Sequence, residues 1–492
     1  MRLSACSTSF GALRGLLRGG ALCCGFCCAL LLADQAGAAL PPTVARAFHD
    51  QRIPLNAVSA YVQEIGAANS VKPLLIHRPS QPMNPASTMK LVTTFAGLEL
   101  LGPDFRWKTE AYADGPIVAG VLTGDLVLKG RGDPKITLEQ FGELVARLRA
   151  TGLSSIRGDL VLDRTWFDTG AYDPGAFDGE PLRPYNVGPD ALAVNFKSVR
   201  FVFAPTLARD TVEVRVEPPL ANVVIHGTPR LAPGDCGDWH SALLAEFNNR
   251  AESADASFRG RYPIACGERD WYVALLDHPH YVLNLFARTW ADVGGSFAGT
   301  VRDGRTPISA THLATLDSVP LYEAVRDINK MSNNLMARQL FLSLATTAYP
   351  PPATTLHAAE AVERWLAKRK LKFPELVMVN GSGLSRHERI AAQSMARLLL
   401  AADSSSVRNE YISSLAVAAT DGTVIKRFQN DEVADQAFLK TGTLEGVRAI
   451  AGYVSGPTGR RFVVVCFVNH PNASRAQPPL DLLVQWVYDH AR

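Results

Sequence analysis

The segment "NPASTMKLVTT", residues 84–94, places Ser87 and Lys90 three residues apart at the start of a stretch with helical periodicity. Residues three apart lie on one face of a helix, so the Ser87 hydroxyl and the Lys90 amine can meet. A serine hydroxyl becomes a nucleophile beside a base, and a lysine is such a base when burial and neighbouring charges keep it neutral. The same letters also fit an ordinary helix start, because serine is a favoured N-cap residue.

Two further motifs favour catalysis over an ordinary helix start. "MSNNLMARQL", residues 331–340, supplies Ser332 and Asn334 at the start of a second helical pattern. "FLKTGTLEG", residues 438–446, is an extended segment that contains Lys440. The motifs S-x-x-K, S-D-N (here S-N-N) and K-T-G, in this order, are the signature of penicillin-binding proteins and serine β-lactamases. Together they predict a serine nucleophile that attacks a carbonyl carbon.

The predicted catalytic residues are Ser87, Lys90 and Ser332. Ser87 attacks the carbonyl, Lys90 accepts its proton, and Ser332 relays a proton to the departing amine. The backbone N–H groups of Ser87 and Thr443 are expected to stabilise the oxyanion of the tetrahedral intermediate.

The predicted substrate-binding residues are Asn334, Lys440, Thr441, Gly442 and Thr443. Asn334 can hydrogen-bond a substrate amide. The charge of Lys440 and the hydroxyl of Thr441 suit a terminal carboxylate, and Gly442 lets the substrate backbone lie close to the strand. We expect no metal ion or other cofactor, because the chain beyond residue 38 has no Cys-x-x-Cys and no His-x-x-x-His pair.

With these motifs the chain resembles the class C, type-4 penicillin-binding proteins, which are serine D-alanyl-D-alanine carboxypeptidases. "NGSGLSR", residues 380–386, and "DGT", residues 421–423, are similar to accessory segments of that family, although the first often begins with Asp where this chain has Asn380. The resemblance implies cleavage of the D-Ala-D-Ala bond in peptidoglycan stem peptides, and often of the D-Ala to diaminopimelate cross-link. It also implies covalent acylation by β-lactams such as the penicillins.

The resemblance further implies an α+β fold of the penicillin-binding transpeptidase type. The catalytic domain is then an antiparallel sheet flanked by helices, with two nested β-rich domains inserted between the first two motifs. We predict a catalytic domain of residues 39–105 and 300–492, a first inserted domain of residues 106–165 and 271–299, and a nested domain of residues 166–270.

Local patterns give further expectations. Alternating apolar and polar residues between Gly turns predict strands across residues 106–165. The pentapeptide "GDLVL" occurs at residues 124–128 and 158–162, which predicts two similar hairpins. "NAVSAYVQEI", residues 56–65, has apolar residues at helical spacing and predicts a helix.

Residues 1–38 have the pattern of a cleaved secretory signal peptide. Three Arg precede an apolar run at residues 21–33, and "AGA" at residues 36–38 fits a cleavage site. The alternative is an uncleaved N-terminal anchor. We therefore predict a periplasmic protein, and the sequence leaves open both its oligomeric state and a loose membrane or wall association. Removing three Arg and one Asp from 50 basic and 47 acidic residues leaves a near balance of charge, which argues against a nucleic-acid partner.

Three cysteines follow residue 38. Cys236 and Cys266 have loop-like flanks and can close a disulfide in an exported protein, although the sequence leaves this pairing open. Cys466 lies in an apolar strand pattern and is expected to be a buried free thiol.

Two other functions remain open at this point. A serine β-lactamase shares the acylation residues, but class A enzymes add a Glu that positions the hydrolytic water, and no motif clearly supplies one. A non-catalytic wall-binding protein with the same fold is the other alternative. Among single residues, Ser382 is expected in a turn near the cleft, His278 and His280 on a solvated loop, and His387 as a residue that could approach the cleft.

Overall fold

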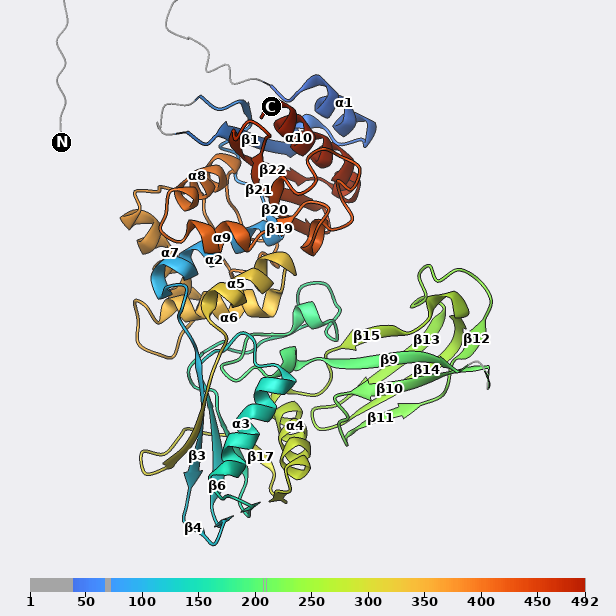
Figure 1. Cartoon of the computed structure of the whole chain (residues 1–492), viewed down its shortest axis with the longest axis vertical. Helices are drawn as coiled ribbons and strands as arrows, with labels where there is room; N and C mark the ends of the chain where they lie inside the picture. The colour runs from blue at the N-terminus through green and yellow to red at the C-terminus, as the bar shows by residue number, and fades with distance from the viewer. Residues whose placement is uncertain (1–38, 67–71, 207, 209, 492) are drawn as a thin grey trace, which may run out of the picture. The chain divides into compact units, whose positions relative to one another are not determined.

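The computed structural model describes residues 39–66, 72–206, 208 and 210–491 (Figure 1). The predicted signal peptide, residues 1–38, lies outside the described residues. Within the part of the chain that is described, no helix is both long and apolar enough to cross a membrane.

A six-stranded sheet joins segments from both ends of the chain. In order across the sheet, its strands are β19 (Ala416–Val417), β20 (Ala437–Leu444), β21 (Val447–Ser455), β22 (Arg461–Asn469), β1 (Val58–Glu64) and β2 (Leu75–His77). Every pair of neighbours is antiparallel. The K-T-G motif therefore lies on β20, the strand beside the short edge strand β19.

Strand β1 corrects the sequence prediction, because the helix expected at residues 56–65 is wrong. All of β1 pairs with β22, and Val58, Ala60 and Val62 are buried in the cluster on one face of the sheet. Over so short a run, helical spacing and strand alternation fit the same apolar residues. Pairing with a strand far along the chain decides between them, and a sequence window cannot contain that partner.

Helices cover both faces of this sheet, as predicted for the catalytic domain. On one face they include α2 (Lys90–Leu101) and α8 (Ala392–Asp403), and on the other α1 (Pro42–Asp50) and α10 (Gln477–His490). Successive residues of β21 therefore enter different cores: Tyr453 packs in the cluster with α2 and α8, and Val454 in the cluster with α1 and α10.

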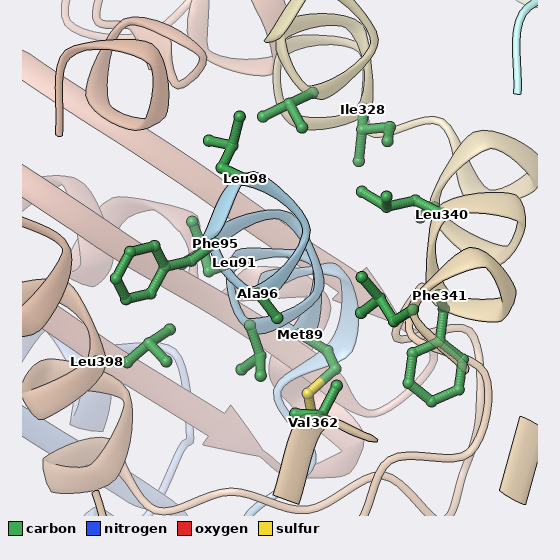
Figure 2. Close-up of a cluster of buried hydrophobic side chains, with 14 of the residues drawn as sticks. Met89, Leu91, Phe95, Ala96, Leu98, Ile328, Leu340, Phe341, Val362 and Leu398 are labelled. Atoms are coloured by element: carbon green, nitrogen blue, oxygen red, sulfur yellow. The ribbon is translucent and has the colours of Figure 1, made fainter. Parts of the chain in front are cut away.

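Helix α2 is the central element of the helical side. The helices α5 (Leu321–Lys330), α6 (Asn334–Ala345), α7 (Thr355–Lys368) and α9 (Arg408–Ser413) also contribute to its cluster. Figure 2 shows Phe95 and Leu98 of α2 among Leu340, Phe341 and other side chains of this cluster. All residues from Lys90 to Leu98 are buried, so α2 is a core helix rather than an amphipathic surface helix. α2 ends at Leu101, and Gly102 follows with φ +88°.

The first inserted region contains a five-stranded sheet. Its strands, in order, are β17 (Val301–Asp303), β8 (Leu160–Asp163), β6 (Asp125–Gly130), β3 (Lys108–Asp114) and β18 (Thr311–Asp317). Two helices, α3 (Leu138–Ala150) and α4 (His278–Asp292), share its apolar core. A smaller sheet has the order β16 (Ser296–Phe297), β7 (Ser155–Ile156), β5 (Val121–Leu122) and β4 (Ile117–Val118).

The two "GDLVL" segments are neighbours in the five-stranded sheet. They form most of β6 and β8, which pair in parallel with Leu126 opposite Leu160 and Leu128 opposite Leu162. The prediction of two similar hairpins is therefore wrong. The repeat instead gives two equivalent strands whose leucines meet in one core, and parallel strands need the longer connection that α3 and β7 provide.

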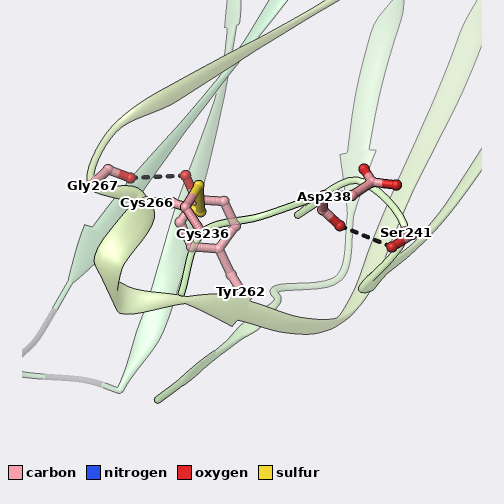
Figure 3. The surroundings of a disulfide bond; sticks show 6 residues. All are labelled: Cys236, Asp238, Ser241, Tyr262, Cys266 and Gly267. Carbon is pink, nitrogen blue, oxygen red and sulfur yellow. Dashed lines mark hydrogen bonds between the residues drawn. A yellow bond between two sulfur atoms is a disulfide. The ribbon is translucent and has the colours of Figure 1, made fainter. Parts of the chain in front are cut away.

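The nested region contains a seven-stranded sheet around aromatic side chains. Its strands are β9 (Val199–Thr206), β10 (Thr211–Glu217), β11 (Val223–His226), β12 (Arg230–Ala232), β13 (Leu243–Asn249), β14 (Ala254–Pro263) and β15 (Arg269–Val273). Cys236 and Cys266 form a disulfide in this region. Elsewhere in the chain, Cys466 is a buried free thiol, as expected. Figure 3 shows the disulfide beside Tyr262, whose hydroxyl donates a hydrogen bond to the Gly267 carbonyl.

Strand pairing suggests different domain limits from those predicted. β17 and β18 pair with β8 and β3, so the sheet of the first inserted region extends to Asp317 rather than ending before residue 300. β15 pairs with β9, so the nested sheet extends to Val273. Residues 166–198 contain only short helical turns and two isolated bridge partners, Phe167 and Val194. We propose that the catalytic domain resumes after Asp317 and that residues 166–198 link the inserted regions to it.

Candidate active site

Ser87 and Lys90 lie where a 3₁₀ turn, η2 (Ala86–Met89), runs into α2. The Nζ atom of Lys90 lies 3.0 Å from Ser87 Oγ. It also donates to Asn334 Oδ1 at 2.7 Å and to the carbonyl oxygen of Ser382 at 2.6 Å. The structure thus brings together Lys90, Asn334 and Ser382, which are far apart in the sequence. It also places the predicted base beside the predicted nucleophile.

Burial sets the protonation of Lys90. The side chain is fully buried, and this desolvation, followed by the positive charges of Lys440 and Arg338, holds the pKa of Lys90 well below its usual range. The Glu388 carboxylate acts in the opposite direction. A lowered pKa favours the neutral amine, whose lone pair can accept the serine proton.

Ser332 and Lys440 form a second pair. Lys440 Nζ donates to Ser332 Oγ at 2.8 Å and to the Thr441 carbonyl oxygen at 3.0 Å. Ser332 has φ +57°, a backbone conformation that costs energy for a residue with a side chain. It stands just before α6, which is capped instead by Asn333. Burial lowers the pKa of Lys440 to about 7, so this lysine changes charge near neutral pH.

Asn334, the first residue of α6, connects the base to the 166–198 segment. Its Oδ1 accepts from Lys90, and its Nδ2 donates to the Tyr185 carbonyl oxygen at 3.2 Å. Arg338, one turn further along α6, donates to the Val187 carbonyl oxygen at 2.7 Å. The linking segment therefore forms a wall beside the predicted catalytic residues.

Strand β20 runs directly against the nucleophile turn. A Cβ on Gly442 would lie 2.6 Å from the Pro85 carbonyl oxygen, so only glycine allows this approach. The next residue, Thr443, accepts a hydrogen bond from Arg448, its partner on β21. On the other side of Gly442, the Thr441 hydroxyl donates to Thr423 of the "DGT" segment at 2.8 Å.

A hollow of about 220 Å³ opens beside this strand. Two arginines, Arg427 and Arg448, line it together with Thr423 and the segment Thr441 to Thr443. Arg427 also forms an ion pair with Asp481. Guanidinium groups and hydroxyls bind carboxylates well, so the hollow suits the carboxylate end of a peptide.

Comparison with known proteins assigns the family. The sequence profile of the D-Ala-D-Ala carboxypeptidase 3 (S13) family matches residues 40–487. The chain belongs to this family. That membership, predicted from the three motifs, assigns D-alanyl-D-alanine carboxypeptidase activity and favours it over the β-lactamase alternative.

Two relatives match most of this chain, and a solved structure shares its fold. The D-alanyl-D-alanine carboxypeptidase of Actinomadura sp. (strain R39) is 30% identical over 394 residues, which cover 76% of this chain and 71% of the relative. The D-alanyl-D-alanine carboxypeptidase DacB of Haemophilus influenzae is 27% identical over 388 residues, covering 78% and 80%. The crystal structure of penicillin binding protein 4 from H. influenzae has a TM-score of 0.74 at 24% identity, covering 91% of this chain and 98% of the other. The predicted α+β fold is confirmed.

The accessory segment of this S13 chain, residues 380–388, encloses the base. The Ser382 hydroxyl donates to Asn380 Oδ1 at 2.8 Å, as expected of a turn residue, while its carbonyl accepts from Lys90. His387 is exposed. Glu388, its neighbour, is fully buried, and sequence reasoning missed it because a charged residue in a polar segment is usually solvated.

The structure also corrects the prediction for His278. The expected solvated loop is the first turn of α4, where the side chain of His278 is only 12% exposed and its Nδ1 lies 3.9 Å from Asp190 Oδ2. Burial lowers the pKa of His278, so the imidazole is neutral at neutral pH. "DHPH" contains the signal that was overlooked, because an Asp followed two residues later by Pro is a helix N-terminus, and Asp277 caps α4.

Proposed function

We propose that Ser87 is the nucleophile and Lys90 the base of a periplasmic D-alanyl-D-alanine carboxypeptidase that acts on peptidoglycan stem peptides. The observation that carries this proposal is the 3.0 Å separation of Lys90 Nζ from Ser87 Oγ, together with the burial that lowers the pKa of Lys90 and so favours the neutral amine. A neutral amine at hydrogen-bond distance is what a serine hydroxyl needs to attack a carbonyl.

In the acylation step, Ser87 Oγ attacks the carbonyl carbon of the penultimate D-Ala as its proton passes to Lys90. The oxyanion lies between the backbone N–H groups of Ser87 and Thr443. Ser332, which accepts a hydrogen bond from Lys440, then relays a proton: its hydroxyl protonates the amine of the departing D-Ala and regains the proton that Lys90 took from Ser87, so that Lys90 is neutral again. The resulting ester is hydrolysed when water attacks it with Lys90 again as the base.

The carboxylate of the terminal D-Ala is proposed to bind at β20. Lys440, Thr441 and Thr443 supply a charge and two hydroxyls, and the hollow beside them adds Arg448. Gly442 leaves room for the substrate backbone along the strand. Asn334 is proposed to contact the substrate amide; its Nδ2 donates to Tyr185 in this structure, so substrate would compete with that contact.

Acylation by β-lactams follows from the same proposal. A penicillin offers a strained amide to Ser87 and a carboxylate to β20. The H. influenzae protein has been crystallised with a β-lactam, and an endopeptidase of Bdellovibrio bacteriovorus has been crystallised acylated by penicillin G. We extend this reaction to the present chain, and with it cleavage of D-Ala cross-links in the cell wall.

The test is the intact mass of the mature protein after addition of penicillin G. The wild type is expected to gain the mass of one penicillin and to keep it for minutes, and Ser87→Ala is expected to gain none. Ser382→Ala is the matched control, because Ser382 is a second buried serine beside Lys90 whose hydroxyl only stabilises a turn. An adduct on Ser87→Ala would refute the assignment. An adduct lost within seconds would indicate a β-lactamase.

A further inference from the structure

Four ionisable groups are buried together around the proposed base. Lys90 and Lys440 have no exposed surface, and Arg338 is 4% exposed. The fourth, Glu388, is also fully buried and is the one acid among the charges that act on Lys90. These groups come from α2, β20, α6 and the accessory segment, so the fold gathers them from four separate parts of the chain.

Glu388 is tied to the base through its own segment. Its Oε1 accepts a hydrogen bond from the Asn380 backbone N–H at 3.3 Å. Asn380 Oδ1 in turn accepts from the backbone N–H of Ser382 at 3.0 Å, and the Ser382 carbonyl accepts from Lys90 at 2.6 Å. The other carboxyl oxygen, Oε2, is buried and has no hydrogen-bond partner within the described residues. Glu388 thus commits one carboxyl oxygen to its own segment.

We propose that Glu388 is a positioning residue for acylation, whose buried carboxylate holds the accessory segment against Lys90 and stabilises the positive charge that Lys90 acquires from Ser87. The proposal rests on the proposed function of Ser87 and Lys90. Glu388 acts through Lys90 and does not touch the substrate.

The electrostatic reason is a balance of charge. Lys440 and Arg338 both disfavour an ammonium at Lys90, and burial disfavours it further. A base with a very low pKa is a poor proton acceptor, because proton transfer to it is uphill. A nearby carboxylate offsets the charge of the two cations. Its stabilising effect is greatest in the transition state, when Lys90 becomes charged.

Glu388 can change charge in the working pH range. Burial raises the pKa of Glu388 to about 7, while the backbone N–H groups of Asn380 and Val379, then Lys90 and the N–H of Gly383, oppose this rise. Arg338, another charged group of this cluster, lies over the Tyr172 ring and donates a hydrogen bond to the Val187 carbonyl oxygen. Both Lys90 and Glu388 thus contribute to the acid limb of the activity profile.

The test is the second-order rate constant of acylation by a fluorescent penicillin, measured from pH 5 to pH 10 on the mature protein. Glu388→Gln keeps the shape and the acceptor for Asn380 but removes the charge. Losing an opposite charge lowers the pKa of Lys90, so the acid limb should move down by roughly one pH unit. The plateau rate should fall about tenfold, because the Lys90 ammonium is less stabilised.

Asp133→Asn is the matched control. Asp133 lies in the first inserted region, is fully buried, and has a pKa raised to about 7 by burial. One of its oxygens accepts a backbone N–H and the other has no partner in the described chain, as in Glu388. The cation that faces it is Lys135 rather than Lys90. Removing this carboxyl is expected to leave the acylation profile unchanged.

Glu388→Asp provides a second, charge-keeping variant. The acid limb of its pH–rate profile should stay within about half a pH unit of the wild type, even though its plateau rate falls. This variant therefore separates the effect of the charge from the effect of the side-chain shape. If Glu388→Gln does not fold, the proposal is overturned when the acid limb of the Glu388→Asp profile is displaced by a full pH unit. A Glu388→Gln profile with an unmoved limb also overturns it, whether or not the plateau changes. These outcomes differ from failure of the proposed function, in which Ser87→Ala would still be acylated.

Discussion

The region around Ser87 and the seven-stranded sheet both contain fully buried side chains, but these buried groups have opposite chemistry. Lys90, Lys440 and Glu388 are fully buried in the first. In the second, Phe203 and Phe258 are fully buried, and their rings contact Trp239, Tyr262 and Trp271. Burying a charge costs folding free energy, whereas burying an aromatic ring contributes it. The comparison agrees with the proposal that the first interior serves catalysis, and it predicts that the second serves stability.

The largest effect that could break this comparison comes from Lys90→Met. We expect acylation by penicillin to fall at least roughly a thousandfold, because the base is lost. The unfolding free energy should change by less than about 2 kcal/mol, since the lost hydrogen bonds are offset by the removal of a desolvated amine. Acylation kinetics and denaturant unfolding measure the two effects.

Lys197→Met is the control for that variant. Lys197 is a lysine of the 166–198 segment whose pKa is also lowered by burial, although Asp277 and Asp190 oppose the shift. The Lys197→Met protein should be acylated by penicillin at the wild-type rate. A Lys90→Met protein that unfolds would show that the charged interior is needed for stability as well.

Phe203→Ala tests the other half of the comparison. Truncating a buried phenylalanine leaves a cavity, and we expect the seven-stranded sheet to lose about 3–5 kcal/mol of unfolding free energy. The folded fraction should be acylated normally, because Phe203 lies in a different hydrophobic cluster from α2, the helix that carries the proposed base Lys90. Leu244→Ala on the same sheet, at a side chain 68% exposed, is the control and should be nearly silent. Loss of acylation in folded Phe203→Ala would show that this sheet supports the site.

The smallest expected effect sharpens the comparison through pH. Burial lowers the pKa of Lys440 to about 7, so its positive charge is present below pH 7 and is lost as the pH rises through that value. The affinity of Ser87→Ala for a D-Ala-D-Ala peptide should therefore fall about tenfold between pH 6 and pH 8. Calorimetric titration measures it without interference from catalysis. Lys440→Arg keeps its charge and should show a flatter profile; an equally steep profile would point to another titrating group.

The sequence predicted what depends on short spacing and missed what depends on distant pairing. Ser87 and Lys90 meet because three residues make nearly one helical turn, and the K-T-G strand was visible from its own alternation. Strand β1 was missed because its partner β22 lies at the other end of the chain. Arg448 and Glu388 were missed because nothing in their own segments shows that one faces Thr443 and that the other is buried beside Lys90.

The order of strands in the six-stranded sheet has a consequence for biosynthesis. β1, near the beginning of the chain, is held between β2 and β22, and β22 ends only at Asn469. Contacts between such remote segments form late, because the whole intervening chain must first be made. Strand β20 therefore reaches its place against the Ser87 turn only after nearly all of the polypeptide has emerged. A peptidase built this way has no competent site while it is still being synthesised, and the same arrangement makes any premature stop before β22 a complete loss of function.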